Sequence, residues 1–383
     1  MDLKLFFNPI DESLSDKSFK ADSLIQSVYL NEEKLPDILN IDIAIIGIKE
    51  NNGYSTITDT GVRFIRKKLY SLKRSNSSTE IVDLGNLRSG PSREETYKRL
   101  KAVCQYLMHK QILPIIIGGS HDIDLGQFLA YEEDDKLISI CNVDSHFDMD
   151  NQTELPSENH IHTMINHNPN FLFNYSHLGY QSYFVSPTIS KIFKQLNFST
   201  YRIGEMREDF KKVEPVIRES DMLSFDISAI QKAYTPAGNK SDVFGLTGEE
   251  ACQIMWYAGL NDKLSSVGIY EYNPEKDTND HQSAQVIAVM IWYFIEGFNN
   301  RKGEKGFQTN DYMKYVVTMD NEPDAITFYK SRLSDKWWME VPNLNNKSIY
   351  ERNTIVPCDH NDYNLALNGE IPDRWIKVFS KHS

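Results

Sequence analysis

Residues 138–148, ISICNVDSHFD, join an apolar run to three ionisable side chains. The mostly apolar run at 138–143 predicts a buried strand, because short runs rich in apolar residues are typical of parallel strands that are covered on both faces. Asp144, His146 and Asp148 follow at i, i+2 and i+4, so they share one face if the strand conformation continues. A metal ion that accepts carboxylates and imidazole would offset their charge at the end of a buried strand. The alternative is a polar strand end whose aspartates cap the next helix.

The stretches around this one alternate between strand and helix patterns. Short apolar runs predict further strands, and longer segments with apolar residues at helical spacing predict helices. The expected strands lie at 41–48, 80–84, 113–117, 222–225 and 265–270, and the expected helices at 61–72, 94–110 and 282–298. Strands that alternate with helices form a mostly parallel sheet covered on both faces, so the sequence predicts an α/β fold. Ligands of such folds collect beyond the carboxyl ends of the strands.

The chain changes in composition after about Asn299. Residues 299–306 have the pattern of a surface loop, and the remainder is rich in Asn, Asp, aromatic residues and Pro. We therefore expect one domain at residues 1–300 and a C-terminal extension at residues 301–383. The extension is expected to pack on the same domain or on a neighbouring subunit.

The charge and the cysteines limit the class of partner. The chain has 41 Lys and Arg against 54 Asp and Glu, a net charge of −13 at pH 7. Nucleic acid is not an expected partner, because no basic excess is present to release counterions from phosphates. No membrane partner is expected either, since no apolar run approaches the roughly 18 residues that cross a bilayer and residues 1–10 lack a secretory signal pattern. Four scattered cysteines are typical of reduced thiols, so we expect a cytoplasmic protein.

Two further strand ends carry ionisable residues. His121 follows the predicted strand at 113–117, within the sequence Gly-Gly-Ser-His-Asp, and Asp226 ends the strand at 222–225 within Ser-Phe-Asp-Ile-Ser. A single histidine near a strand end is usually only hydrogen-bonded. Two histidines and three aspartates at the exits of parallel strands form a convergent set, however, and such a set favours a metal site.

The order of these motifs resembles a known family. Gly-Gly-x-His, Asp-x-His-x-Asp and Ser-Phe-Asp, followed by Gly-Leu-Thr at 245–247 and Glu-Tyr-Asn-Pro at 271–274, are similar to the arginase, agmatinase and formimidoylglutamase (ureohydrolase) superfamily over roughly residues 40–300. The resemblance implies a three-layer α/β/α arginase-like fold, one or two Mn²⁺ ions, and a homo-oligomer, either a trimer or a hexamer. It also implies that a metal-activated hydroxide hydrolyses a C–N bond of a small cationic amidine or guanidine, of the formiminoglutamate, arginine or agmatine type.

The resemblance implies a ligand set for the metal ions. One ion would be bound by His121, Asp144, Asp148 and Asp226. The other would be bound by His146 together with Asp144 and Asp226, which would bridge the pair, and Ser228 occupies the position of a further ligand.

The resemblance also implies roles in catalysis and in substrate binding. Asp148 would orient the hydroxide, and Glu271 would pair with the cationic group of the substrate. A loop histidine would give a proton to the leaving amine, and His162 matches this position better than His160. The part of the loop that contacts the substrate carboxylate contains Ser157 and Asn159.

Ser228 departs from the family pattern, which has an aspartate at this position. Serine is a poor neutral ligand, so the ion next to His146 should bind weakly. Mixed oxygen and nitrogen ligands also accept Ni²⁺, Co²⁺ or Zn²⁺ in place of Mn²⁺. The alternative function is a degenerate ureohydrolase relative with one ion or none, which acts as a binding or structural protein.

Overall fold

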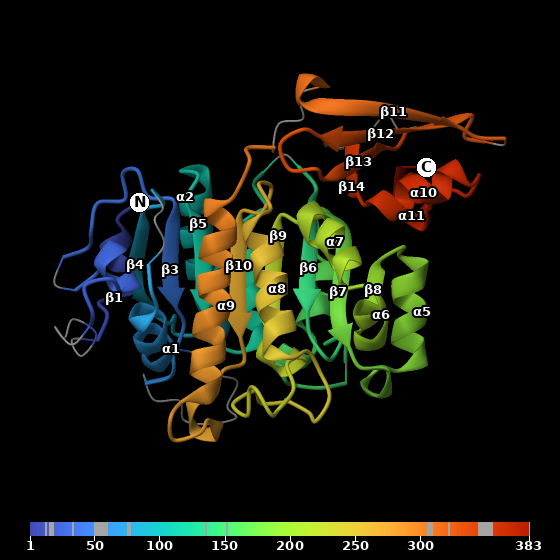
Figure 1. The fold of residues 1–383 in the computed structure, drawn as a ribbon. Helices are drawn as coiled ribbons and strands as arrows, with labels where there is room; N and C mark the ends of the chain where they lie inside the picture. The colour runs from blue at the N-terminus through green and yellow to red at the C-terminus, as the bar shows by residue number, and fades with distance from the viewer. Residues whose placement is uncertain are drawn as a thin grey trace.

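A central, mostly parallel sheet forms the middle layer of the computed structural model (Figure 1). The structure describes residues 1–11, 14, 19–32, 34–49, 60–74, 78–134, 136–150, 152–304, 309–320, 322–343 and 355–382. Within these residues the strand order is β1-β4-β3-β5-β10-β9-β6-β7-β8, and β2 pairs with β4. The only antiparallel pair of neighbours among them is β1 and β4. The strands are β1 (Phe7–Asn8), β2 (Val28–Leu30), β3 (Ile43–Gly47), β4 (Ile81–Leu87), β5 (Leu113–Ile117), β6 (Ile138–Val143), β7 (Leu172–Tyr180), β8 (Ser199–Arg202), β9 (Met222–Asp226) and β10 (Ser266–Tyr270).

Helices cover both faces of this sheet. They are α1 (Thr60–Ser71), α2 (Arg93–His109), α3 (Asp124–Leu129), α4 (His160–Ile165), α5 (Pro187–Gln195), α6 (Ile203–Glu208), α7 (Val213–Glu219), α8 (Gly248–Gly259) and α9 (Gln282–Asn299). Figure 1 shows α1, α8 and α9 in front of the strands and α2 behind them.

Successive side chains of each strand point to opposite faces of the sheet, so each strand contributes to the apolar core on both faces. In β3, Ile43 and Ile45 join an apolar cluster with residues of α1, α8 and α9. Ala44 and Ile46 point the opposite way and join a second cluster with residues of α2. Both faces are buried, which is why this strand reads as one continuous apolar run. The predicted α/β fold, with helices on both faces of a mostly parallel sheet, is confirmed.

The strands β7 and β8 were not predicted from the sequence. Residues 172–180 read LFNYSHLGY, and the polar Asn174, Ser176 and His177 interrupt any apolar run. These three side chains are nevertheless buried. Their burial depends on neighbours that come from distant parts of the chain, so the local pattern did not indicate a strand.

The C-terminal residues form a second, antiparallel sheet. Its order is β11 (Tyr312–Thr318), β12 (Ala325–Ser331), β13 (Trp337–Glu340) and β14 (Ile355–Cys358), and the helices α10 (His360–Leu367) and α11 (Asp373–His382) follow. This sheet and its helices share an apolar cluster of their own, which includes Phe328, Met339 and Trp375. In Figure 1 it lies near the amino ends of β6 and β7.

Arg218 of α7 joins this sheet to the rest of the chain. Its guanidinium donates hydrogen bonds to the carbonyl oxygens of Trp337, at 3.0 Å, and Cys358, at 2.9 Å. The guanidinium carbon also lies 4.3 Å from the centre of the Trp338 ring. The C-terminal sheet therefore packs on α7 of the same chain, while the predicted boundary at residues 300 and 301 stays a prediction.

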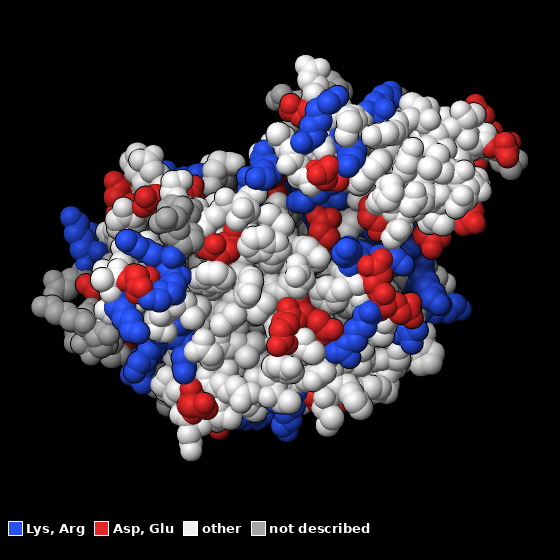
Figure 2. All heavy atoms as spheres, in the orientation of Figure 1, with Lys and Arg blue, Asp and Glu red and all other residues white. Residues whose placement is uncertain are grey.

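The surface over the front helices carries few charges. Figure 2 shows a largely uncharged area over α8 and α9, with acidic and basic side chains interspersed around it. Among the described residues, no helix has the length and the apolar composition that a membrane span requires.

Candidate metal centre

Four neighbouring strands deliver polar side chains to one end of the sheet. His121 follows β5, Asp144 follows β6, Asp226 ends β9 and Glu271 follows β10. These strands are adjacent in the order β5-β10-β9-β6. Because the strands are parallel, their carboxyl ends meet at the same edge, where such folds bind ligands.

A glycine turn carries the chain from β5 to His121. Gly118 and Gly119 have φ values of +89° and +82°, and residues other than glycine rarely adopt such values. A Cβ atom on Gly118 would also lie 2.8 Å from the carbonyl oxygen of Ile48. The turn therefore requires glycine, and it brings the imidazole of His121 over the ends of the strands.

One histidine and three aspartates group closely at this edge. Candidate ligand atoms of His121, Asp144, Asp148 and Asp226 all lie within 4.8 Å of one another, and all four residues are buried. The Nδ1 atom of His121 lies 3.2 Å, 3.3 Å and 3.5 Å from the Oδ2 atoms of Asp144, Asp148 and Asp226, respectively.

The other ring nitrogen of His121 indicates which tautomer is present. The hydroxyl of Ser224 donates to Asp124 Oδ2 at 2.9 Å, and His121 Nε2 lies 3.0 Å from the Ser224 oxygen. The Ser224 proton is thereby committed to Asp124, so Nε2 of His121 is the donor in its own contact. In the neutral ring the lone pair is therefore on Nδ1, the atom that faces the three carboxylates, and a cation bound among these groups would accept it.

The electrostatics of the group also favour a cation. Burial, and then the Asp144 carboxylate, raise the pKa of Asp226 well above its ordinary value. Burial lowers the pKa of His121, but the adjacent carboxylates of Asp144 and Asp148 outweigh this and hold the pKa well above the usual range. Asp144 Oδ2 is buried without a hydrogen bond from any described residue. Crowded carboxylates and one imidazole are a donor set that fits a divalent metal ion.

His146 and Ser228 lie outside this group of ligand atoms. The half-buried ring of His146 stacks on Phe184, with 4.3 Å between ring centroids, and its Nδ1 lies 2.8 Å from the Ser145 hydroxyl. Ser228 is buried beside the group, and its hydroxyl donates to Asp144 Oδ1 at 3.3 Å. The structure therefore places a neutral hydroxyl next to the group and turns the second predicted imidazole to another partner.

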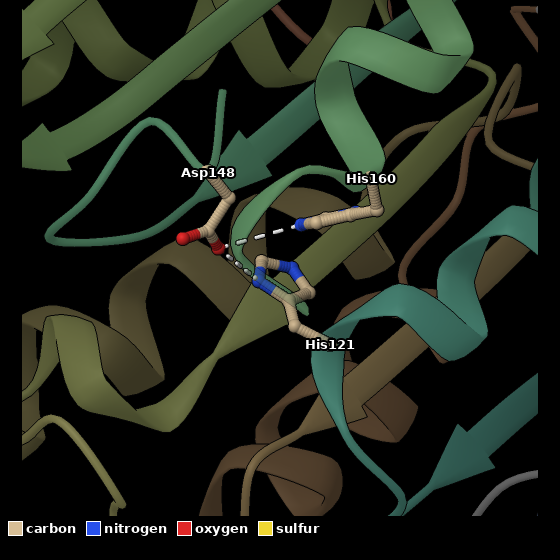
Figure 3. Close-up of side chains that lie close together, drawn as sticks. All are labelled: His121, Asp148 and His160. Atoms are coloured by element: carbon tan, nitrogen blue, oxygen red, sulfur yellow. Dashed lines mark hydrogen bonds and ion pairs between the residues drawn. The ribbon is translucent and has the colours of Figure 1, made fainter. Parts of the chain in front are cut away.

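His160 lies in the group of side chains, as Figure 3 shows. Its Nε2 is 3.4 Å from Asp148 Oδ2, and its Nδ1 is 2.7 Å from Asp124 Oδ1. Burial lowers the pKa of His160, but the Asp124 carboxylate outweighs it and raises the pKa to about 9. His162, two residues further along α4, is half-buried and is not one of the described residues that group here.

Glu271 is buried and bound from both sides. Its backbone has a φ of +68°. Its Oε1 accepts a hydrogen bond from the backbone N–H of His121 at 2.9 Å, and its Oε2 accepts one from the Asn239 amide at 2.7 Å. Burial raises its pKa. The carboxylate is thus held in a fixed orientation beside the cluster.

Two predicted substrate contacts have unused polar atoms. The hydroxyl of Ser157 and Oδ1 of Asn159 are buried, and within the described part of the chain neither has a hydrogen-bond partner. Buried polar atoms without partners are uncommon in proteins. These two atoms therefore have unused hydrogen-bonding capacity.

Sequence reasoning missed Lys240. Its ammonium lies 3.2 Å from Asp148 Oδ1 and 3.4 Å from Glu158 Oε1. Burial lowers the pKa of Lys240, but the Asp148 carboxylate and other nearby carboxylates outweigh it and raise the pKa. The residue lies in the long loop between β9 and α8, between the Ser-Phe-Asp and Gly-Leu-Thr motifs. Its place between two motifs was the only signal in the sequence.

Comparison with known proteins places this arrangement in a family. Residues 41–296 match the family model described as the Arginase family. A formimidoylglutamase of Staphylococcus haemolyticus is 24% identical over 306 residues, which cover 76% of this chain and 97% of that protein. A formimidoylglutamase of Streptococcus gordonii is 24% identical over 298 residues, which cover 71% of this chain and 89% of that protein.

Solved structures show the same fold. The formimidoylglutamase of Bacillus subtilis matches with a TM-score of 0.65 and 16% identity, over 75% of this chain and 94% of that one. The Trypanosoma cruzi formiminoglutamase with Mn²⁺₂ matches with a TM-score of 0.62 and 19% identity, over 68% of this chain and 94% of that one. The family match spans most of the chain and contains every strand end that carries the cluster, so the protein belongs to the arginase family, as its motifs predict.

Proposed function

We propose that this protein is a metal-dependent hydrolase that splits a C–N bond in a small linear amidine or guanidine. The observation that carries the proposal is the buried group of His121, Asp144, Asp148 and Asp226, whose ligand atoms lie within 4.8 Å of one another. Membership of the arginase family supports the reaction class.

The four grouped residues would hold a divalent ion, and Mn²⁺ is the first candidate because a relative of the same fold is described with it. A bound ion of this kind lowers the pKa of a bound water toward neutrality and supplies a nucleophile for a trigonal carbon. The role of the chain is to keep its ligands deprotonated and oriented. Ser224 orients His121, since it accepts the proton of Nε2 and so turns Nδ1 to the position of the ion.

We assign the proton transfer to His160 rather than to His162. The Nε2 atom of His160 faces the cluster beside Asp148, and Asp124 holds its Nδ1. An imidazole fixed in this way can deliver a proton to a leaving nitrogen from a defined position. The sequence favours His162 because Thr-Met follows it, but His162 lies half-buried outside the cluster.

Glu271 and the loop that contains Ser157 would bind the substrate. The carboxylate of Glu271 is oriented by two donors and retains lone pairs that can accept hydrogen bonds from an amidinium group. The hydroxyl of Ser157 can donate to a distal carboxylate, and Asn159 Oδ1 can accept from a substrate N–H. The names of the relatives favour a formimino group such as that of formiminoglutamate. A homo-oligomer, either a trimer or a hexamer, and a cytoplasmic location stay predictions.

The test is a substrate panel with protein that has been loaded with Mn²⁺. Formiminoglutamate, arginine, agmatine and guanidinobutyrate are each supplied, and release of formamide, ammonia or urea is measured. We expect turnover of one of them and none with Asp226→Asn, which removes a charged ligand. If Mn²⁺ binds and none of the four is hydrolysed, the proposal is wrong.

One observation favours a second candidate, a degenerate relative that binds ligands without turnover. Ser228 supplies no charge, and His146 stacks on Phe184 instead of joining the cluster. In this reading the protein binds one ion or none. Amidine binding measured by calorimetry, together with no product in the same panel, would favour it over hydrolysis.

A further inference from the structure

The ammonium of Lys240 contacts the cluster of proposed metal ligands directly. It lies 3.2 Å from Asp148 Oδ1, and 3.4 Å from Glu158 Oε1 at the rim of the site. Lys240 is mostly buried, with 23% of its side chain exposed, and Asp148 is 3% exposed. A positive charge is therefore built into the site.

We propose that this site binds a single divalent ion, and that Lys240 provides a fixed positive charge in place of a second ion. The inference rests on the proposed function, because it uses the same four ligands. It goes further in assigning the number of ions and a positioning role to Lys240.

The two residues that the family resemblance assigns to a second ion alone, His146 and Ser228, face other partners. Ser228 offers a neutral hydroxyl, which already donates to Asp144. His146 is paired with Ser145 through Nδ1 and is stacked on Phe184. Among the described His, Cys, Asp and Glu residues, His146 does not belong to the groups that are close enough to hold an ion. The remaining set is complete for one ion, with one imidazole nitrogen and three carboxylates.

The two oxygens of Asp148 are divided between the cluster and the lysine. Oδ2 faces His121 Nδ1 at 3.3 Å and His160 Nε2 at 3.4 Å. Oδ1 accepts a hydrogen bond from Lys240. The ammonium thus fixes the rotation of the carboxylate, so that Oδ2 points to the ion position.

The ammonium adds a fixed positive charge beside the carboxylates of Asp144, Asp148 and Asp226. A second ion next to Asp148 would meet the repulsion of this charge, which is strong where water is excluded.

The loop that carries Lys240 also positions Glu271. The adjacent residue, Asn239, donates to Glu271 Oε2 at 2.7 Å. Two consecutive residues therefore hold two carboxylates of the site, one beside the ion position and one beside the proposed substrate position. The loop from β9 to α8 couples the orientation of both groups.

Metal binding tests this inference directly. Mn²⁺ is titrated into the full chain by calorimetry, bound Mn²⁺ is counted by elemental analysis after dialysis, and its EPR spectrum is recorded. Wild type is expected to bind one Mn²⁺ per chain, with the spectrum of an isolated ion. His146→Ala should leave this stoichiometry unchanged.

Substitution of Lys240 gives the second readout. Lys240→Met removes the charge and keeps the apolar stem, so Mn²⁺ should bind at least tenfold more tightly while any kcat falls. Lys240→Arg should resemble wild type. Lys232→Met, an exposed lysine of the same loop, should change neither quantity. Circular dichroism confirms that each variant is folded.

Several results would overturn the inference. Two ions per chain in wild type, reduced to one by His146→Ala, would show a pair of ions. If folded Lys240→Met binds Mn²⁺ with the affinity of wild type, the charge of Lys240 has no effect on the ion and the inference is wrong. The proposed function fails separately: one bound ion and a Lys240 effect without turnover of any amidine would support the inference and reject hydrolysis.

Discussion

The Nδ1 atom of His160 lies 2.7 Å from Oδ1 of Asp124, and this contact points the opposite nitrogen of the ring to Asp148. Asp124 also accepts a hydrogen bond from Ser224, which contacts Nε2 of His121. One buried carboxylate thus orients both histidines of the cluster. The pair resembles the arrangement in which a carboxylate fixes the tautomer of a functional imidazole.

We predict that His160→Asn reduces kcat far more than His162→Asn does. Loss of a positioned proton donor lowers the rate of the chemical step by about 10²–10⁴-fold. Of these two histidines, His160 is the one that faces the cluster. His162→Asn should cost less than about tenfold, because the residue is half-buried outside the group of ligand atoms. Both kcat values are measured on the best substrate of the panel. Equal losses in the two variants would contradict the assignment of His160.

Ser224→Ala should weaken Mn²⁺ binding without removing a ligand. The Ser224 hydroxyl keeps the proton of His121 on Nε2, and the loss of such an orienting contact typically costs about 10–100-fold in metal affinity. The matched control is Ser266→Ala, a buried serine at the amino end of β10 that bonds to Gln127. It should lower stability and leave the Mn²⁺ dissociation constant unchanged. Equal effects in the two variants would show general destabilisation instead.

Arg218→Met should loosen the C-terminal sheet from α7. The guanidinium donates to the carbonyls of Trp337 and Cys358 and covers the Trp338 ring. The loss of a charged donor to buried carbonyl groups lowers the stability of a protein by about 1–3 kcal/mol. Limited proteolysis should release the C-terminal sheet faster than in wild type. The control Arg202→Met removes an exposed ion pair with Glu205 and should change little. Identical cleavage rates in all three proteins would contradict this role of Arg218.

Lys381 predicts a pH dependence of stability. Burial lowers the pKa of Lys381 to about 8. The carboxylate of Glu219 acts against this shift, and the positive charge of Lys377 adds to it. An unfolded lysine has a pKa of about 10.4. Between these values the unfolded chain keeps a proton that the folded chain has lost, so this group adds stability as the pH rises from about 8 to about 10.4.

The comparison with Lys381→Met isolates this effect. The unfolding free energy of wild type, relative to that of the variant, should rise by about 1–2 kcal/mol between about pH 7 and about pH 10. This is less than the full pKa shift of Lys381 would give, because the side chain is partly exposed to solvent. Denaturant unfolding at both pH values measures it. Lys191→Met, an exposed lysine on α5, is the control and should show no such gain. A constant difference between wild type and Lys381→Met would contradict the prediction.

The sequence by itself determined the framework and the chemistry at its edge. Strands such as 43–47 and 138–143 are mostly apolar because both of their faces are covered, and this pattern is readable without the structure. The helices predicted at 61–72, 94–110 and 282–298 lie within one residue of α1, α2 and α9. Since parallel strands end at a common edge, residues that follow β5, β6 and β9 had to approach one another.

Only the tertiary structure decided how individual side chains are directed within that edge. His160 and His162 differ by two positions on one short helix, which turns about 100° per residue, so they face different surroundings. The stacking of His146 on Phe184 and the polar strands β7 and β8 depend on residues that are distant in sequence. Lys240 reaches Asp148 across 92 positions, through a loop whose path no local pattern specifies. Contacts of this kind arise from packing, which local periodicity does not encode.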